Sequence, residues 1–170
     1  MGGIIWVTNI SKQVFAVVNP LWAWYYEGYP LPSRLILIWN EGVKNELNEV
    51  INFVKRIYNS AGARLEFETV EIPEDFEAYW NYFGEKVIER ILEMEEVDEV
   101  ILDMTPGRKF MSVVMFRAFG ILKEKFKKIG REVAVRIIYL HLLDLTYQSE
   151  PFPKIPFSKQ KMLIYPERGV

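Results

Sequence analysis

Two short polar segments contain most of the residues that could bind a ligand or act on it. The first, TNISKQ (8–13), offers these donors and acceptors: Thr8, Asn9, Ser11, Lys12 and Gln13. The second, DMTPGRK (103–109), offers a comparable set: Asp103, Thr105, Pro106, Gly107, Arg108 and Lys109. Hydroxyls, amides and cations are natural partners of phosphate oxygens. Together the segments predict a site for a phosphate-rich ligand that also carries hydroxyl groups.

The second segment joins an apolar strand to a helix. Free N–H groups and the helix dipole favour an anion at such a helix start. Gly107 lets the backbone come close to a ligand, and Pro106 suits a position before or within the first turn. We expect Asp103 to cap the turn or to bind a hydroxyl.

The elements that would position these segments alternate along the chain. Apolar or alternating runs predict strands at 3–8, 34–39, 64–70, 99–104, 132–142 and 161–166. Spacings of 3 and 4 between apolar residues predict helices at 12–28, bent or interrupted near Asn19-Pro20, and at 42–61, 74–96 and 108–129. This order predicts an α/β fold, a Rossmann-like three-layer sandwich whose six-stranded, mostly parallel sheet has the order 3-2-1-4-5-6.

In that order the first and fourth strands are neighbours, and the chain leaves them in opposite directions. Open α/β sheets bind ligands in the crevice at this switch point. The segments 8–13 and 103–109 follow these two strands, so the predicted topology brings them together at that crevice.

Standard nucleotide motifs are absent. No GxGxxG follows the first strand, and Gly107 is followed by Arg-Lys-Phe instead of the Lys-Ser/Thr of a P-loop. The stretch RIIYLH (136–141) matches Arg-x4-His, a pattern of certain helical RNases, but here it reads as a strand that points the two side chains to opposite faces. His141 is therefore expected to be structural or solvated.

Composition narrows the classes of protein further. The chain of 170 residues suits a single domain, 1–170, and its lack of Cys and single His argue against thiol chemistry and metal sites, so no cofactor is expected. The net charge of −2 argues against duplex nucleic-acid binding. Without a signal peptide or a long apolar run, a cytoplasmic protein with no membrane contact is expected.

Charge is unevenly distributed along the chain. Residues 71–103 carry 12 acidic and 2 basic side chains, whereas residues 104–137 carry 9 basic and 2 acidic ones. Two solvated helix faces of opposite sign would explain this pattern, and so would a local positive field beside an anion site.

At the same two segments the sequence resembles the CARF domains, the Rossmann-like sensor domains of type III CRISPR systems. The stretch 7–42 is similar to their first strand, ligand loop, helix and second strand, and ILDMTPGRKFMSVVMF (101–116) resembles their strand, Thr-x-Gly-x-Lys and apolar helix. Many members have Thr-Gly-Gly-Thr-Lys where this chain has residues 105–109. The resemblance implies a homodimer that binds a cyclic oligoadenylate, an RNA second messenger, across its two-fold axis.

The resemblance leaves three activities open. A stand-alone, metal-independent ring nuclease would cleave the messenger to a 2′,3′-cyclic phosphate, with Ser11 orienting a phosphate oxygen and Lys109 stabilising the developing charge. A sensor would bind the ring without cleaving it and signal to a partner. An unrelated α/β protein would bind a different nucleotide. The Pro-rich loop 144–159 could cover either the ligand site or the dimer interface.

Overall fold

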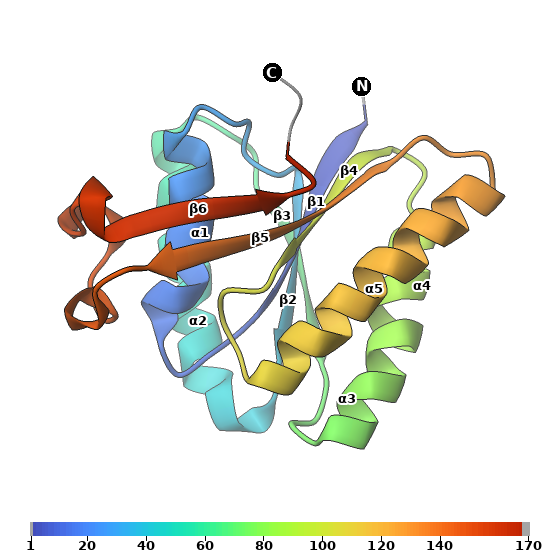
Figure 1. Ribbon diagram of the computed structural model, residues 1–170, viewed down its shortest axis with the longest axis horizontal. Coiled ribbons are helices and arrows are strands. Elements are labelled where there is room, and N and C mark those ends of the chain that lie inside the picture. The colour runs from blue at the N-terminus through green and yellow to red at the C-terminus, as the bar shows by residue number, and fades with distance from the viewer. Residues whose placement is uncertain (1, 168–170) are drawn as a thin grey trace.

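The computed structural model describes residues 2–167 and contains one six-stranded sheet with helices on both faces (Figure 1). The strands lie in the order β3-β2-β1-β4-β5-β6, which confirms the predicted fold class. All neighbours are parallel except β6, which returns antiparallel to β5. The strands are β1 (Gly3–Asn9), β2 (Arg34–Trp39), β3 (Glu66–Glu71), β4 (Val97–Asp103), β5 (Ala134–Leu142) and β6 (Gln160–Tyr165).

The burial of each strand follows from its place in the sheet. The central strands β1, β2 and β4 are buried along most of their length because helices cover both of their faces. Strand β3 lies at one edge, and its side chains alternate between half-buried and exposed positions. The carboxyl ends of β1 and β4 therefore meet in the centre of the sheet.

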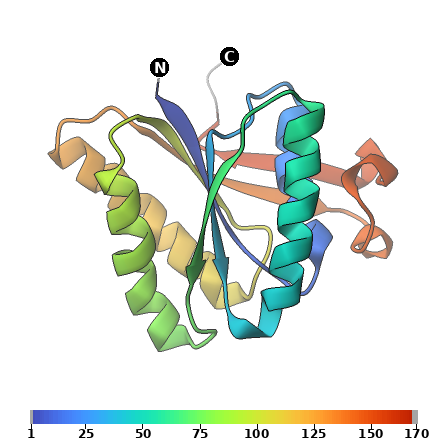
Figure 2. The ribbon, with the colours of Figure 1, turned by 180° about the vertical axis from the view of Figure 1, so that it is seen from behind.

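Two helical layers enclose the sheet (Figures 1 and 2). The helices are α1 (Val14–Tyr26), α2 (Lys44–Ser60), α3 (Phe76–Phe83), α4 (Glu89–Glu93) and α5 (Lys109–Lys128). Helices α1 and α2 pack on one face through a core that includes Trp6, Trp24 and Tyr58. Helices α3, α4 and α5 pack on the other face, where Tyr79 and Phe126 are buried.

Helix α1 runs without interruption from Val14 to Tyr26 although Pro20 lies inside it. Proline removes one backbone donor and usually kinks or breaks a helix. Here Val17, Leu21 and Trp24 are buried on the sheet side, so packing holds the helix together on both sides of the proline.

The segment predicted as one helix at 74–96 contains a π-helical turn at Gly84–Ile88, between α3 and α4. A π turn accommodates one extra residue within a helical rod. The consecutive residues Val87 and Ile88 of this turn are both buried. The apolar spacing predicted the helix but not this local irregularity.

The connection between β5 and β6 contains three short 3₁₀ turns, at 145–147, 152–154 and 157–159. Asn19 of α1 fixes it in place: its side chain donates to the carbonyl of Glu150 at 2.9 Å and accepts from the backbone N–H of Phe152 at 2.8 Å. The Phe152 ring is buried beside Trp22, so this loop is docked on α1.

Candidate functional site

The two polar segments meet at the switch point of the sheet. Strands β1 and β4 pair as far as Val7 and Leu102. One residue further on, the hydroxyl of Thr8 donates a hydrogen bond of 3.0 Å to Oδ2 of Asp103. Both side chains are buried, so this bond connects the two strand ends from which the loops start.

Asp103 also organises the start of the second loop. Its Oδ1 accepts the backbone N–H of Thr105 at 2.9 Å, and the hydroxyl of Thr105 in turn accepts the N–H of Leu140 in β5 at 2.9 Å. Burial raises the pKa of the Asp103 carboxyl to about 7, although the hydrogen bonds from Thr105 and Thr8 act in the opposite direction. The buried carboxyl of Asp103 therefore stabilises the turn at the start of the second loop.

Asn9 points into the protein instead of towards solvent. Its Oδ1 accepts a hydrogen bond of 2.5 Å from the hydroxyl of Tyr79 on α3, and its Nδ2 lies 4.0 Å from the sulfur of Met115 on α5. The residue is 1% exposed. Direct contact between Asn9 and a ligand stays a prediction, whereas the side chain already ties β1 to the helices of one face.

Gly107 forms the tightest part of the second loop. Its φ is +98°, a left-handed conformation that glycine adopts without steric cost. A Cβ at this position would lie 3.0 Å from the sulfur of Met111 and 3.4 Å from Cβ of Asn9. The first loop and α5 thus approach the backbone of Gly107 closely, while the neighbouring Pro106 is buried.

The exposed side chains of the two loops carry the positive charge. Lys12 forms an ion pair of 3.1 Å with Glu46 of α2, and Arg108 pairs with Glu74 in the turn before α3. Lys109 is exposed and, among residues 2–167, no carboxylate lies within ion-pairing distance of it. Of the three cations in the two loops, Lys109 is therefore the one that can bind an anion without first losing an ion pair within the described residues.

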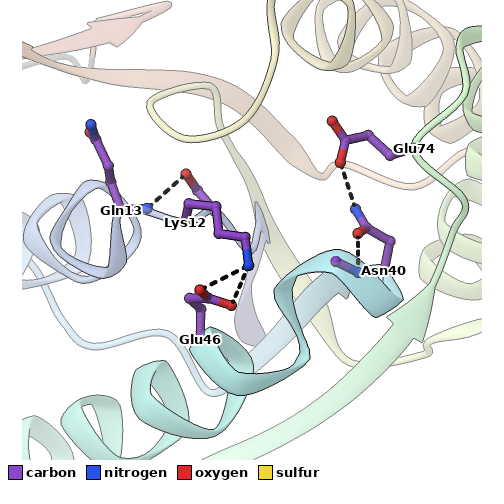
Figure 3. A network of polar contacts seen from close by, with 7 residues as sticks. Lys12, Gln13, Asn40, Glu46 and Glu74 are labelled. Carbon is purple, nitrogen blue, oxygen red and sulfur yellow. Dashed lines mark hydrogen bonds and ion pairs between the residues drawn. The ribbon is translucent and has the colours of Figure 1, made fainter.

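Helix α5 begins at Lys109 and is 20 residues long. Its first turn contains no acidic residue, and no side chain of the described part caps it with an oxygen. Its positive end therefore adds to the charge of Lys109. In the first loop, Ser11 Oγ accepts the N–H of Gln13 at 3.2 Å, and the side chains of Lys12 and Gln13 are exposed (Figure 3).

A pocket of about 260 Å³ lies beside these loops. Gln13 and Thr105 line it from the two segments, while residues 139–142 line it from the end of β5. The docked loop between β5 and β6 closes its far side with these residues: Leu145, Gln148 and Ile155. Sequence reasoning did not assign this pocket, because only the antiparallel return of β6 brings that loop back to α1.

The Arg-x4-His pattern does not assemble a site. Arg136 donates to Glu99 at 2.7 Å and to the carbonyl of Pro166 at 2.6 Å. His141 is exposed at the end of β5, where its ring lies 5.9 Å from that of Tyr139. The two side chains of the pattern thus have separate surroundings.

A larger pocket of about 570 Å³ lies at the opposite end of the sheet, beside the amino ends of the strands. Its two arginines, Arg34 and Arg64, both pair with Glu66. The free positive charge and the open helix end lie at the switch point, which is therefore the better candidate for an anion site.

Within residues 2–167, no three His, Asp or Glu side chains come together in a way that could hold a metal ion. Nor does any helix in that range have the length and apolar character needed to cross a bilayer.

No family model and no curated protein matches the sequence. A solved structure does match: Enterococcus italicus Csm6 bound to cyclic hexa-2′-fluoro-hexa-dAMP. The match covers 96% of this chain and 41% of that chain, with a TM-score of 0.58 and 17% sequence identity. The two chains share a fold. This chain spans about two fifths of the length of that Csm6 chain, and at this identity the likeness is one of architecture.

Proposed function

We propose that this protein binds a cyclic oligoadenylate at the loops 8–13 and 103–109, as a CARF-like domain that acts as a homodimer. The observation that carries the proposal is the position of Lys109: an unpaired cation at the open positive end of α5, directly above the joined ends of β1 and β4. The shared fold with a Csm6 chain bound to a cyclic hexanucleotide analogue supports the same ligand class.

The chemistry of the neighbouring pocket suits the rest of such a ligand. Leu140, Leu145 and Ile155 offer apolar surface to a base, and the amides of Gln13 and Gln148 offer both donors and acceptors. Phosphates would lie over Lys109 and the first turn of α5, and a base would enter the pocket. No metal ligand is needed for this mode of binding.

A bare apolar surface supports the proposed homodimer. Cross-strand pairing places Tyr139 beside Leu163 and puts both on the face of the sheet away from α1. In Figure 1 no helix lies in front of β5 and β6 on that side. Apolar and aromatic residues of α5 continue the surface, which we call the β5–β6 face: Val113, Phe116, Phe119, Tyr139, Leu163 and Tyr165.

The β5–β6 face exposes several large apolar side chains side by side. Phe116 is 59% exposed and Tyr165 is 61% exposed, and both rings contact Phe119. Contiguous apolar patches beyond a few hundred Å² usually mark an interface. Helix α5 starts at Lys109 and passes along this face, so a two-fold axis here would bring two copies of the ligand loop towards one ring.

Ring cleavage is a second activity that one observation favours. Attack of a ribose 2′-OH on its own phosphodiester needs in-line alignment and stabilisation of negative charge more than it needs a strong base. The unpaired Lys109 at the helix start is suited to that charge, and the half-exposed Ser11 hydroxyl is suited to orient a phosphate oxygen.

The test is direct binding followed by product analysis. Titration with cyclic tetra- and hexa-adenylate in EDTA should give saturable binding of at least one ring, and Lys109→Ala should weaken it about ten- to a hundred-fold, the value of a charge-assisted hydrogen bond. Lys127→Ala, at the other end of α5, is the matched control and should bind like the parent.

Turnover separates the two activities. A linear product with a 2′,3′-cyclic phosphate end, lost in Lys109→Ala, identifies a ring nuclease. Saturable binding without product identifies a sensor. Failure of both rings to bind would exclude the proposed function.

A further inference from the structure

Two of the three loop cations are already engaged in the free protein. Lys12 Nζ lies 3.1 and 3.4 Å from the two oxygens of Glu46, and Nε of Arg108 donates to Glu74. Figure 3 shows the Lys12–Glu46 pair and the contact of Glu74 with Asn40. A phosphate that approaches either cation therefore competes with a carboxylate for it.

The two carboxylates are themselves held in place. Glu46 lies in the first turn of α2, where its own backbone N–H and then Lys12 keep the pKa of its carboxyl below the usual range. The second oxygen of Glu74 accepts from Nδ2 of Asn40 at 3.4 Å. The other end of the Asn40 side chain accepts the N–H of Gly42 at 2.9 Å.

The four charged residues follow four neighbouring strands, at the carboxyl ends of those strands. The cations follow β1 and β4, whereas Glu46 and Glu74 follow β2 and β3. The acidic residues thus come from segments that supply none of the predicted ligand residues.

We propose that Glu46 and Glu74 form an acidic latch that holds Lys12 and Arg108 in the free protein and that a ligand must open by exchanging carboxylates for phosphates. This inference rests on the proposed function and adds a means of regulating the same site. Lys109 is the cation that a ligand with one phosphate meets without competition from a carboxylate of the described residues. A ring with several phosphates gains two further cations, but each of them replaces an existing ion pair.

The latch sets affinity by a moderate factor, because both ion pairs are partly exposed. The side chains of Lys12 and Arg108 are 68% and 70% exposed. Pairs of this kind typically change an equilibrium by about two- to five-fold. Opening both should therefore change ring affinity by about four- to twenty-five-fold if the two act independently.

The first experiment measures ring binding by Glu46→Gln, Glu74→Gln and the double variant. Each single variant should bind about two- to five-fold tighter than the parent, and the double variant should show the product of the two gains. The controls Glu49→Gln and Glu77→Gln remove the same charge from the same segments, where neither carboxylate has an ion pair within the described residues. If the controls gain as much as the latch variants, or the latch variants gain nothing, the latch is overturned.

The second experiment does not depend on the ring. Carboxyl titration by NMR should give Glu46 a pKa that rises in Lys12→Met, and the Arg108 Nε–H signal should change its exchange rate in Glu74→Gln. Sodium tripolyphosphate, a polyanion without bases, should bind more tightly to the double variant than to the parent. Tighter tripolyphosphate binding without ring binding would support the latch and exclude the proposed ligand, whereas unchanged NMR signals in both variants would overturn the latch.

Discussion

The hydroxyl of Thr8 donates a 3.0 Å hydrogen bond to the buried carboxyl of Asp103, and this bond joins the carboxyl ends of the two central strands. The same carboxyl accepts the N–H of Thr105. The segments 8–13 and 103–109 are therefore connected by a buried polar contact.

Asp103→Asn should make the stability of the protein less dependent on pH. Burial raises the pKa of Asp103 from 3.8 to about 7, so the unfolded chain loses this proton at lower pH than the folded protein does. The contribution of a protonated Asp103 is fully present below about pH 4 and is lost as pH rises towards 7, by at most about 1.4 kcal/mol per pH unit. Urea unfolding of parent and variant at stepped pH measures the difference.

Thr8→Val tests the hydrogen bond between Thr8 and Asp103. It removes a hydrogen bond that lowers the pKa of Asp103, so the pH window over which stability is lost should extend upwards. If parent, Asp103→Asn and Thr8→Val show the same pH dependence, Asp103 does not titrate in this range.

Gly107→Ala should destabilise the protein and weaken ligand binding together. The left-handed backbone at φ +98° costs an alanine about 1–2 kcal/mol, and its Cβ would press on Met111 and Asn9. Gly28→Ala is the control: Gly28 has φ +87° but no atom within 4 Å of the added Cβ. Both variants should lose stability in thermal unfolding, and only Gly107→Ala should also lose affinity for the ring.

Tyr79→Phe should destabilise the protein by about 1–3 kcal/mol, because it leaves the buried Oδ1 of Asn9 without its donor. Denaturant unfolding measures the loss. Tyr82→Phe on the same helix is the control, since Tyr82 is 40% exposed and its hydroxyl can reach water. Equal stability of the two variants would mean that the Tyr79–Asn9 bond contributes nothing measurable.

Phe116→Lys should convert a dimer into monomers. A lysine in the centre of the β5–β6 face would be buried without a partner, which should raise the dimer dissociation constant at least about a hundred-fold. Ile129→Lys is the control, because Ile129 is 55% exposed at the far end of α5. Analytical ultracentrifugation distinguishes the species, and a parent protein that sediments as a monomer would contradict the proposed interface.

The sheet order could be predicted because strand-like and helix-like periods alternate clearly along the chain. The same reasoning placed the segments 8–13 and 103–109 at one crevice, and the Thr8–Asp103 bond confirms that they meet. The π turn at 84–88 could not be predicted, because the buried pair Val87 and Ile88 fits the apolar stripe of an ordinary helix almost as well.

Burial within the site was also beyond the reach of the sequence. Polar side chains such as Thr8, Asn9 and Asp103 are expected at the surface, and they are buried here because partners distant in the sequence satisfy them. The pairing of Arg108 with Glu74 likewise joins loops 34 positions apart. The residue types indicated which chemical groups the site contains. Only the fold determined which of these side chains are buried or paired and which are exposed.

The hydroxyl of Thr105 accepts the N–H of Leu140, at the position where the backbone pairing of β4 with β5 would otherwise end. One amide proton in β5 therefore reports on the ligand loop from outside it. Its hydrogen-exchange rate should fall when the loop is clamped by a bound ring and rise when Thr105 is replaced by alanine. A single backbone resonance of Leu140 would then follow loop opening in the native protein, with no label placed in the site itself.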